Sequence, residues 1–139
     1  MRSGSKSLLL KRSADVNAKP AYARGGTALQ FAALKGNCKL AAELIERGAY
    51  LYALPSKSHG RWPLVGAAEH GRLDMISFLW KAKNEFICLE KESGFEEKHC
   101  RRAMDLAVKN CHYACKNLIS ELSGYSHTKE PEETVLGYP

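Results

Sequence analysis

The chain lacks several patterns that identify common enzymes and membrane proteins. None of its 139 residues belongs to a run approaching the roughly 18 apolar residues of a membrane-spanning helix. The stretch from Ser7 to Leu10 is too short for the apolar region of a signal peptide. No glycine loop of the kind that holds phosphates is present, and no Ser, Cys or Lys nucleophile has a base at motif spacing. The sequence therefore predicts a protein that is not an enzyme, has no cofactor and does not enter a membrane.

The five cysteines form no regular framework and include no Cys-x-x-Cys pair. An odd number favours a reducing compartment, so we expect an intracellular protein of the cytoplasm or nucleus. Zinc is an alternative, because His99-Cys100 and Cys111-His112-x-x-Cys115 contain five possible ligands. Structural zinc sites usually use a tight Cys-x-x-Cys pair, and free cysteine often behaves as a small core residue. We therefore expect core and turn residues here, and no metal.

Basic residues are concentrated near the N-terminus. Residues 1–35 hold seven Lys or Arg against Asp15 alone, which gives this part a charge of +6. Such a segment favours an acidic protein partner or nucleic acid, or it is a solvated cap. Apart from Tyr22, few aromatic residues interleave with the basic ones, so base stacking has little support. A basic protein associated with nucleic acid stays as the alternative function.

The most informative feature is an internal repeat. The residues from Gly60 to Leu79 repeat the pattern of the residues 35 positions earlier. A fixed period in this range indicates stacked supersecondary units. The corresponding residues are Leu29 and Leu64, Ala32-Ala33 and Ala67-Ala68, Gly36 and Gly71, and Leu44 and Leu79.

Each repeat has the pattern of two short helices. Thr27 is a good N-cap, and Leu29, Ala32 and Ala33 then follow at the spacing of one apolar helix face. Gly36 ends this first helix, because glycine adopts a left-handed conformation readily. A second apolar helix and an extended finger complete the unit. A unit of this size cannot bury its apolar face alone, so neighbouring units must stack.

This pattern resembles the ankyrin repeat, whose core reads Thr-Pro-Leu-His-x-Ala-Ala-x-x-Gly-His-Leu and ends in Gly-Ala-Asp-Val-Asn-Ala. The last four of these residues are present as Asp15 to Ala18. The stretch from Gly66 to Met75 also resembles the ankyrin tails of large fungal multidomain proteins. In those proteins the repeats often follow a nucleotide-binding switch domain that is absent here, so a degenerate fragment of a larger array is a further alternative.

The resemblance implies an all-α, ankyrin-repeat solenoid of stacked helix-turn-helix units with short finger loops. We expect a disordered N-terminus at 1–6, the array at 7–122, and a disordered tail at 123–139. Within the array, five extra residues enter the last unit between Asn84 and Arg101, with a turn at Ser93-Gly94. The units are a half repeat at 7–18, repeats at 19–53 and 54–88, and a degenerate repeat at 89–122.

Several residues depart from the ankyrin pattern. Trp62 replaces the capping Thr, which removes a cap worth about 1 kcal/mol. Gln30 and Val65 replace a histidine that usually bonds across to a neighbouring turn. Ser13 and Lys83 replace the terminal glycine, each at a cost of about 1 kcal/mol. These departures predict an array of marginal stability.

Ankyrin arrays bind proteins through their finger tips and the concave surface of the first helices. By resemblance we expect a monomeric, non-catalytic module that binds a protein partner in this way. Glu69 beside His70 could suggest acid–base chemistry, but both fall at variable outward positions, so a binding role is favoured. The expected partner-binding residues are Tyr22, Arg24, Leu34, Lys35, His59, Arg61, Glu69 and His70.

Overall fold

A computed structural model describes residues 26–57 and 60–127 of the chain. These residues form six helices and no strand, which confirms the all-α prediction. The predicted N-terminus at 1–6, the half repeat at 7–18 and the tail from residue 128 lie outside the described residues. The helices are α2 (Ala28–Lys35), α3 (Cys38–Glu46), α4 (Pro63–Glu69), α5 (Leu73–Glu85), α6 (Glu97–Lys109) and α7 (Tyr113–Ser123).

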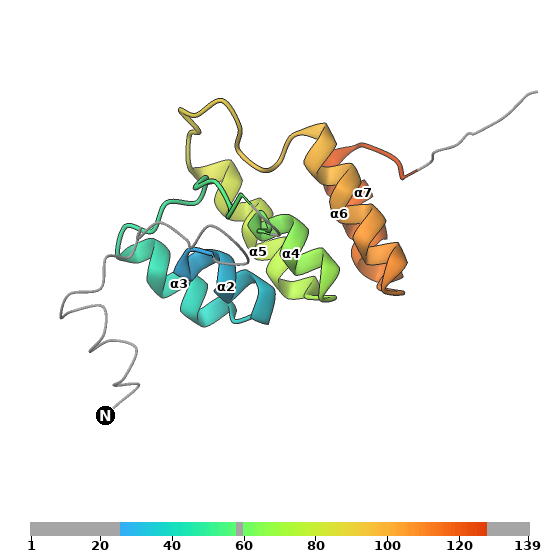
Figure 1. Cartoon of the computed structure of the whole chain (residues 1–139), viewed down its shortest axis with the longest axis horizontal. Helices are drawn as coiled ribbons and strands as arrows, with labels where there is room; N and C mark the ends of the chain where they lie inside the picture. The colour runs from blue at the N-terminus through green and yellow to red at the C-terminus, as the bar shows by residue number, and fades with distance from the viewer. Residues whose placement is uncertain (1–25, 58–59, 128–139) are drawn as a thin grey trace, which may run out of the picture.

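The helices form three pairs that stand side by side in chain order (Figure 1). In one layer α4 packs against both α2 and α6, and in the other layer α5 contacts α3 and α7. Alanines allow the helices of neighbouring pairs to approach closely, because they add almost no bulk. Ala33, Ala67 and Ala103 have no exposed surface. The core therefore runs as a continuous band between the two layers.

A reciprocal pair of hydrogen bonds fixes the start of α2. The Thr27 hydroxyl accepts from Gln30 N at 3.1 Å, and Thr27 N donates to Gln30 Oε1 at 2.9 Å. This capping box satisfies two backbone donors that the helix itself cannot pair. Gln30 Nε2 also donates to Ala53 O at 3.0 Å. The bond across to a neighbouring segment, which the sequence led us to expect would be lost at Gln30, is thus present.

The central helix α4 starts without a side-chain cap. Trp62 occupies the cap position, Pro63 follows, and residues 63–68 are all buried. The Trp62 ring is itself 7 % exposed and lies 4.9 Å from the His99 ring, centroid to centroid. It also covers Gly94, where the ring leaves no room for a Cβ atom. Trp62 therefore replaces a local cap with packing against the last unit.

The end of α5 corrects one expectation from the sequence. The helix continues past Lys83 to Glu85, and its C-cap Phe86 has an extended backbone with φ −120°. Because Lys83 is helical, the strain expected from the missing glycine does not arise there. Instead, the buried Tyr52 hydroxyl donates to Phe86 O at 2.6 Å and lies 3.2 Å from Lys83 O. A tyrosine from the loop between α3 and α4 thus caps this helix.

The extra residues of the last unit form the long loop between α5 and α6, at the upper edge of Figure 1. The expected turn is present, because Gly94 has φ +88°. The Glu96 carboxylate closes this turn by accepting from Ser93 N at 2.8 Å, from Ser93 Oγ at 2.9 Å and from Gly94 N at 3.1 Å. Glu96 is also the N-cap residue of α6, so the turn that its carboxylate closes leads directly into this helix.

The described structure extends past the expected end of the array at residue 122. Ser123 is the last residue of α7, and Ser120 Oγ donates to Tyr125 O at 2.8 Å. Arg101 of α6 donates to Ser126 O at 2.7 Å. Residues 123–127, predicted as the start of a disordered tail, therefore belong to the packed structure.

Candidate functional site

The predicted residues at the ends of the first helices lie at equivalent positions in neighbouring units. Leu34 and Lys35 end α2 beside Gly36, whereas Glu69 and His70 end α4 beside Gly71. Lys35 and His70 are exposed, and Leu34 and Glu69 are partly buried. The C-terminal ends of α2 and α4 thus present a polar edge, which we call the turn edge. Its third member is the turn after α6, at Asn110 and Cys111.

Side chains of one helix pair donate hydrogen bonds to the turn edge of the preceding pair. Arg72 Nε donates to Leu34 O at 2.9 Å, and Asn110 Nδ2 donates to Glu69 O at 3.2 Å. In each case a side chain of one unit satisfies a C-terminal carbonyl of the preceding first helix, which helix geometry leaves unpaired. The same type of contact therefore recurs between the pairs α2/α3 and α4/α5 and between the pairs α4/α5 and α6/α7.

The turn glycines are needed for both conformation and space. Gly36 and Gly71 have φ +73° and +71°, a region that side chains rarely tolerate. A Cβ atom at Gly71 would lie 2.6 Å from His112 Nδ1, and one at Gly36 would lie 2.8 Å from Arg72 Cδ. Cys111 has φ +64° at the third turn and is exposed. It thus stands where the first two turns have glycine, which agrees with the turn residues expected in this Cys/His group.

Two of the predicted binding residues pair with each other. Arg61 Nε lies 2.8 Å from Glu69 Oε1, and each side chain is 23 % exposed. Arg61 also donates to Gly60 O at 3.3 Å, while His70 Nδ1 lies 3.1 Å from Gly66 O. The pair ties the loop before α4 to the end of that helix. Arg61 and Glu69 therefore carry a structural contact, which leaves Lys35 and His70 as the more accessible polar groups.

Three of the eight predicted partner-binding residues lie in segments that the structure does not describe. Tyr22, Arg24 and His59 lie outside the described residues. The other five predicted residues come from the C-terminal ends of α2 and α4 and from the segment just before α4, and of these Arg61 and Glu69 are in contact.

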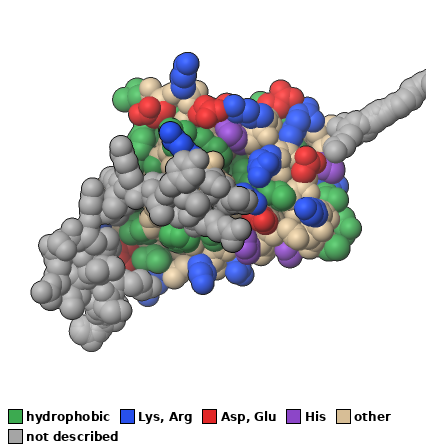
Figure 2. Space-filling model, viewed as in Figure 1, with side chains coloured by type: hydrophobic (Ala, Val, Ile, Leu, Met, Phe, Trp, Pro, Cys, Tyr) green, Lys and Arg blue, Asp and Glu red, His purple; other side chains and the backbone are tan. Residues whose placement is uncertain are grey.

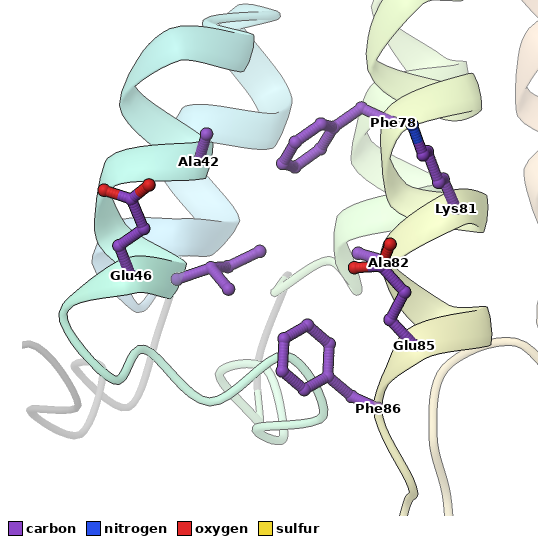
Figure 3. A pocket seen from close by; sticks show the side chains of 8 residues that line it. Ala42, Glu46, Phe78, Lys81, Ala82, Glu85 and Phe86 are labelled. Carbon is purple, nitrogen blue, oxygen red and sulfur yellow. The ribbon is translucent and has the colours of Figure 1, made fainter.

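A second, apolar surface was not predicted from the sequence. Phe86, Ile87 and Leu89 follow α5 and are 46, 84 and 87 % exposed. Phe86, together with Phe78 of α5, points into the space between α3 and α5 (Figure 3). The one available signal was an apolar run, Phe86 to Leu89, within an otherwise charged stretch. Apolar periodicity does not predict a role for such a run, because the run does not lie on one face of a helix.

The cysteines in the described residues have different environments. Burial raises the pKa of the Cys100 thiol to about 11, and this thiol donates to Phe95 O at 3.3 Å. Cys115 is also buried, as expected, whereas Cys38 is only partly buried. Residues 26–57 and 60–127 contain no group of three or more His, Cys, Asp or Glu side chains arranged to hold a metal ion.

A comparison with protein-family models and one with curated proteins each find no match for this chain. None of the helices described here combines the length and the apolar character needed to cross a bilayer. The surfaces above are therefore interpreted from the chain's own residues.

Proposed function

We propose that the chain is an ankyrin-type array that binds a protein partner through the turn edge, the adjoining surface of its first helices and its fingers. The recurring contact at the turns carries this proposal. The side chain of Arg72 packs against Gly36, and that of His112 packs against Gly71. These two pairs of residues occupy corresponding positions in successive units. Such a repetition is expected when one helix-turn-helix unit is stacked several times.

Protein binding is favoured over nucleic-acid binding by the distribution of charge. On the face seen in Figure 2, Lys and Arg side chains are scattered among Asp and Glu side chains over the described residues. Nucleic-acid sites instead gather basic residues in a patch or stripe. Most basic residues that support the alternative, such as Lys6, Lys11 and Arg12, lie outside the described residues.

The experiment begins with affinity capture and mass spectrometry to identify a partner, followed by calorimetry on purified components. Lys35→Ala with His70→Ala removes two exposed polar groups at the ends of α2 and α4. We expect a loss of about 1 kcal/mol or more of binding free energy if these groups are anchors, and a change in stability within about 0.5 kcal/mol.

A matched control is Lys39→Ala with Asn117→Ala, which changes exposed residues of α3 and α7. This control should bind as the unchanged protein does. Equal affinity of both double variants would contradict a site at the turn edge. A steep fall of affinity with salt for a polynucleotide, in the absence of a protein partner, would favour the alternative.

A further inference from the structure

An apolar groove lies between the second helices α3 and α5, in the layer that the proposed function does not use. It has a volume of about 440 Å³. Figure 3 shows Phe78 of α5 and Phe86, which follows this helix, pointing toward α3, with Ala42 on the opposite wall. Ile45 and Ala82 complete its apolar lining. We call this feature the α3–α5 groove.

The groove continues past the end of α5. A neighbouring hollow of about 260 Å³ shares Ile45 and Phe86 with it and is also lined by Tyr50 and Ile87. Together these residues form one apolar strip, and Leu89, which follows Ile87 closely in the chain, is 87 % exposed. Contiguous exposed apolar surface of this kind marks an interaction site more often than isolated apolar residues do.

The rim of the groove carries an excess of negative charge. Glu46 of α3 and Glu85 of α5 stand on opposite walls and are exposed, with Lys81 as the basic residue of the lining. Neither glutamate takes part in an ion pair within the described residues. Glu90 adds a third carboxylate beside the strip, where it accepts from the Tyr50 hydroxyl at 3.2 Å. The rim is therefore complementary to a basic ligand.

We propose that the α3–α5 groove binds an amphipathic helix of a partner protein, with an apolar face in the groove and Lys or Arg residues along its flanks. The walls are themselves helices of 9 and 13 residues, about 13 and 20 Å long, which suits a helix of two to four turns. Amphipathic helices commonly bind between such walls through apolar residues spaced three and four apart. The acidic rim selects basic flanks and repels nucleic acid.

Self-association through this groove is disfavoured by its charge. In a two-fold dimer the same patch meets itself, so Glu46 and Glu85 of one copy would approach the acidic rim of the other. Like charges that face each other across an interface are unfavourable. A partner of opposite charge avoids this repulsion.

The test uses the full chain and synthetic 18-residue helical peptides, with binding followed by fluorescence anisotropy. The probe places Leu on one helix face and Lys on the others, and its control carries Glu in place of Lys with the same Leu pattern. We expect the Leu/Lys peptide to bind at least tenfold more tightly than the Leu/Glu peptide. Equal binding of the two peptides, or no binding of the Leu/Lys peptide at millimolar concentration, would overturn the proposal.

Two variants locate the site. Glu46→Lys with Glu85→Lys should weaken binding of the Leu/Lys peptide at least tenfold, whereas Asp105→Lys with Glu121→Lys, an equal charge change at exposed residues of α6 and α7, should not. Phe86→Ser should also weaken it, with Leu122→Ser as the matched control on α7. Unchanged affinity in the groove variants would place the peptide elsewhere and reject the groove.

Other occupants give distinct results. Replacing Leu8, Leu9 and Leu10 by Ser in the full chain should leave peptide affinity unchanged. A tenfold gain would show that the chain's own basic N-terminal segment already fills the groove, and would overturn an external partner. A dimer in sedimentation analysis that Phe86→Ser dissociates would assign the groove to a second copy.

Discussion

His99 is the most unusual single residue of the described structure. It is 8 % exposed, and its Nε2 atom has no hydrogen-bond partner among the described residues. Nε2 lies 3.6 Å from Glu92 Oε2 and 3.6 Å from Glu96 Oε1, and the Trp62 ring covers the imidazole. Burial lowers the pKa of His99, against the opposite effect of the two carboxylates, and Lys98 lowers it further.

We predict that folding stability falls as the pH drops below about 6.5, the ordinary pKa of histidine, toward the lower pKa of folded His99. In this window the unfolded chain binds more protons at this residue, so protonation favours unfolding. His99→Gln should remove part of the slope, as measured by urea unfolding between pH 5 and 7.5.

The matched control is Asn117→Gln, which places the same amide at an exposed position of α7 without changing a titratable group, and which should leave the slope as it is. Glu92 and Glu96 do not mask the effect, because their pKa values are lowered below the ordinary value of 4.5, so their contribution to stability is lost only at more acid pH. A protein more stable at pH 5.5 than at pH 7.5 would contradict the burial argument.

At the residue scale, local conformation could be predicted and long-range pairing could not. Thr27 as a cap and Gly36 and Gly71 as left-handed turns follow from rules that involve a few neighbouring residues. The bond between Arg61 and Glu69 joins two segments whose relative position depends on the whole unit. Sequence position alone therefore assigned both residues to the surface and could not show that they pair.

Among the elements, α2 and α4 start in different ways although their sequences repeat. Thr27 caps α2 with hydrogen bonds, whereas Trp62 packs its ring at the start of α4 against α6 and the loop before it. A hydroxyl at position 62 would supply a cap but leave the space of the indole empty. At position 62 a residue can therefore stabilise the fold either by burying an aromatic ring or by capping α4, but not by both.

We predict that Trp62→Thr destabilises the protein by about 2–4 kcal/mol. Truncating a buried Trp to a small residue costs about 3–5 kcal/mol, and the new cap returns about 1 kcal/mol. Thr27→Ala, which removes only a cap, should cost about 1 kcal/mol by the same measure. Urea unfolding of both variants provides the comparison, and a Trp62→Thr protein as stable as the unchanged one would show that the ring contributes little.

Helix positions followed from apolar spacing, whereas the ends of helices depended on neighbours. The spacing of Leu29, Ala32 and Ala33 is a local signal for α2. The end of α5 is set by Tyr52, which lies 31 residues before Lys83 in the chain. No pattern within α5 indicates this contact, so the sequence placed Lys83 at the position of a terminal glycine and predicted a strain that is absent there.

On the scale of the whole molecule, α4 is the central element, because it touches both other first helices. Residues 63–68 are all buried, and Ala67 has no exposed surface. Stability of the stack therefore depends on a helix of only seven residues, whose two flanking contacts require small side chains.

We predict that Ala67→Leu destabilises the protein by about 1–3 kcal/mol or prevents folding, since the larger side chain overpacks a closed contact. Ala114→Leu is the control, because Ala114 is exposed on α7 and leucine suits a helix there. Thermal unfolding followed by circular dichroism compares the two. Identical melting curves for both variants would mean that Ala67 has room around it.

The all-α class and the order of helix pairs could be read from the repeat, because each unit repeats the same local signals. The α3–α5 groove could not be predicted from the repeat. It lies between the second helices of two units, and how two units pack is not described by the local signals within either helix. Repeat patterns describe what units share, whereas this groove reflects a difference between them.

The side chains that cover the turn glycines limit how the stack can be lengthened. A unit grafted after α7 would bring its own side chain over residue 111, where Cys111 now carries a Cβ atom. It would also displace Tyr125, Ser126 and His127, which contact α6 and α7. A copy of α4 and α5 inserted before α6 meets neither obstacle, because it presents a glycine turn to the existing His112. A further unit after α7 therefore requires changes at residue 111 and in residues 125–127.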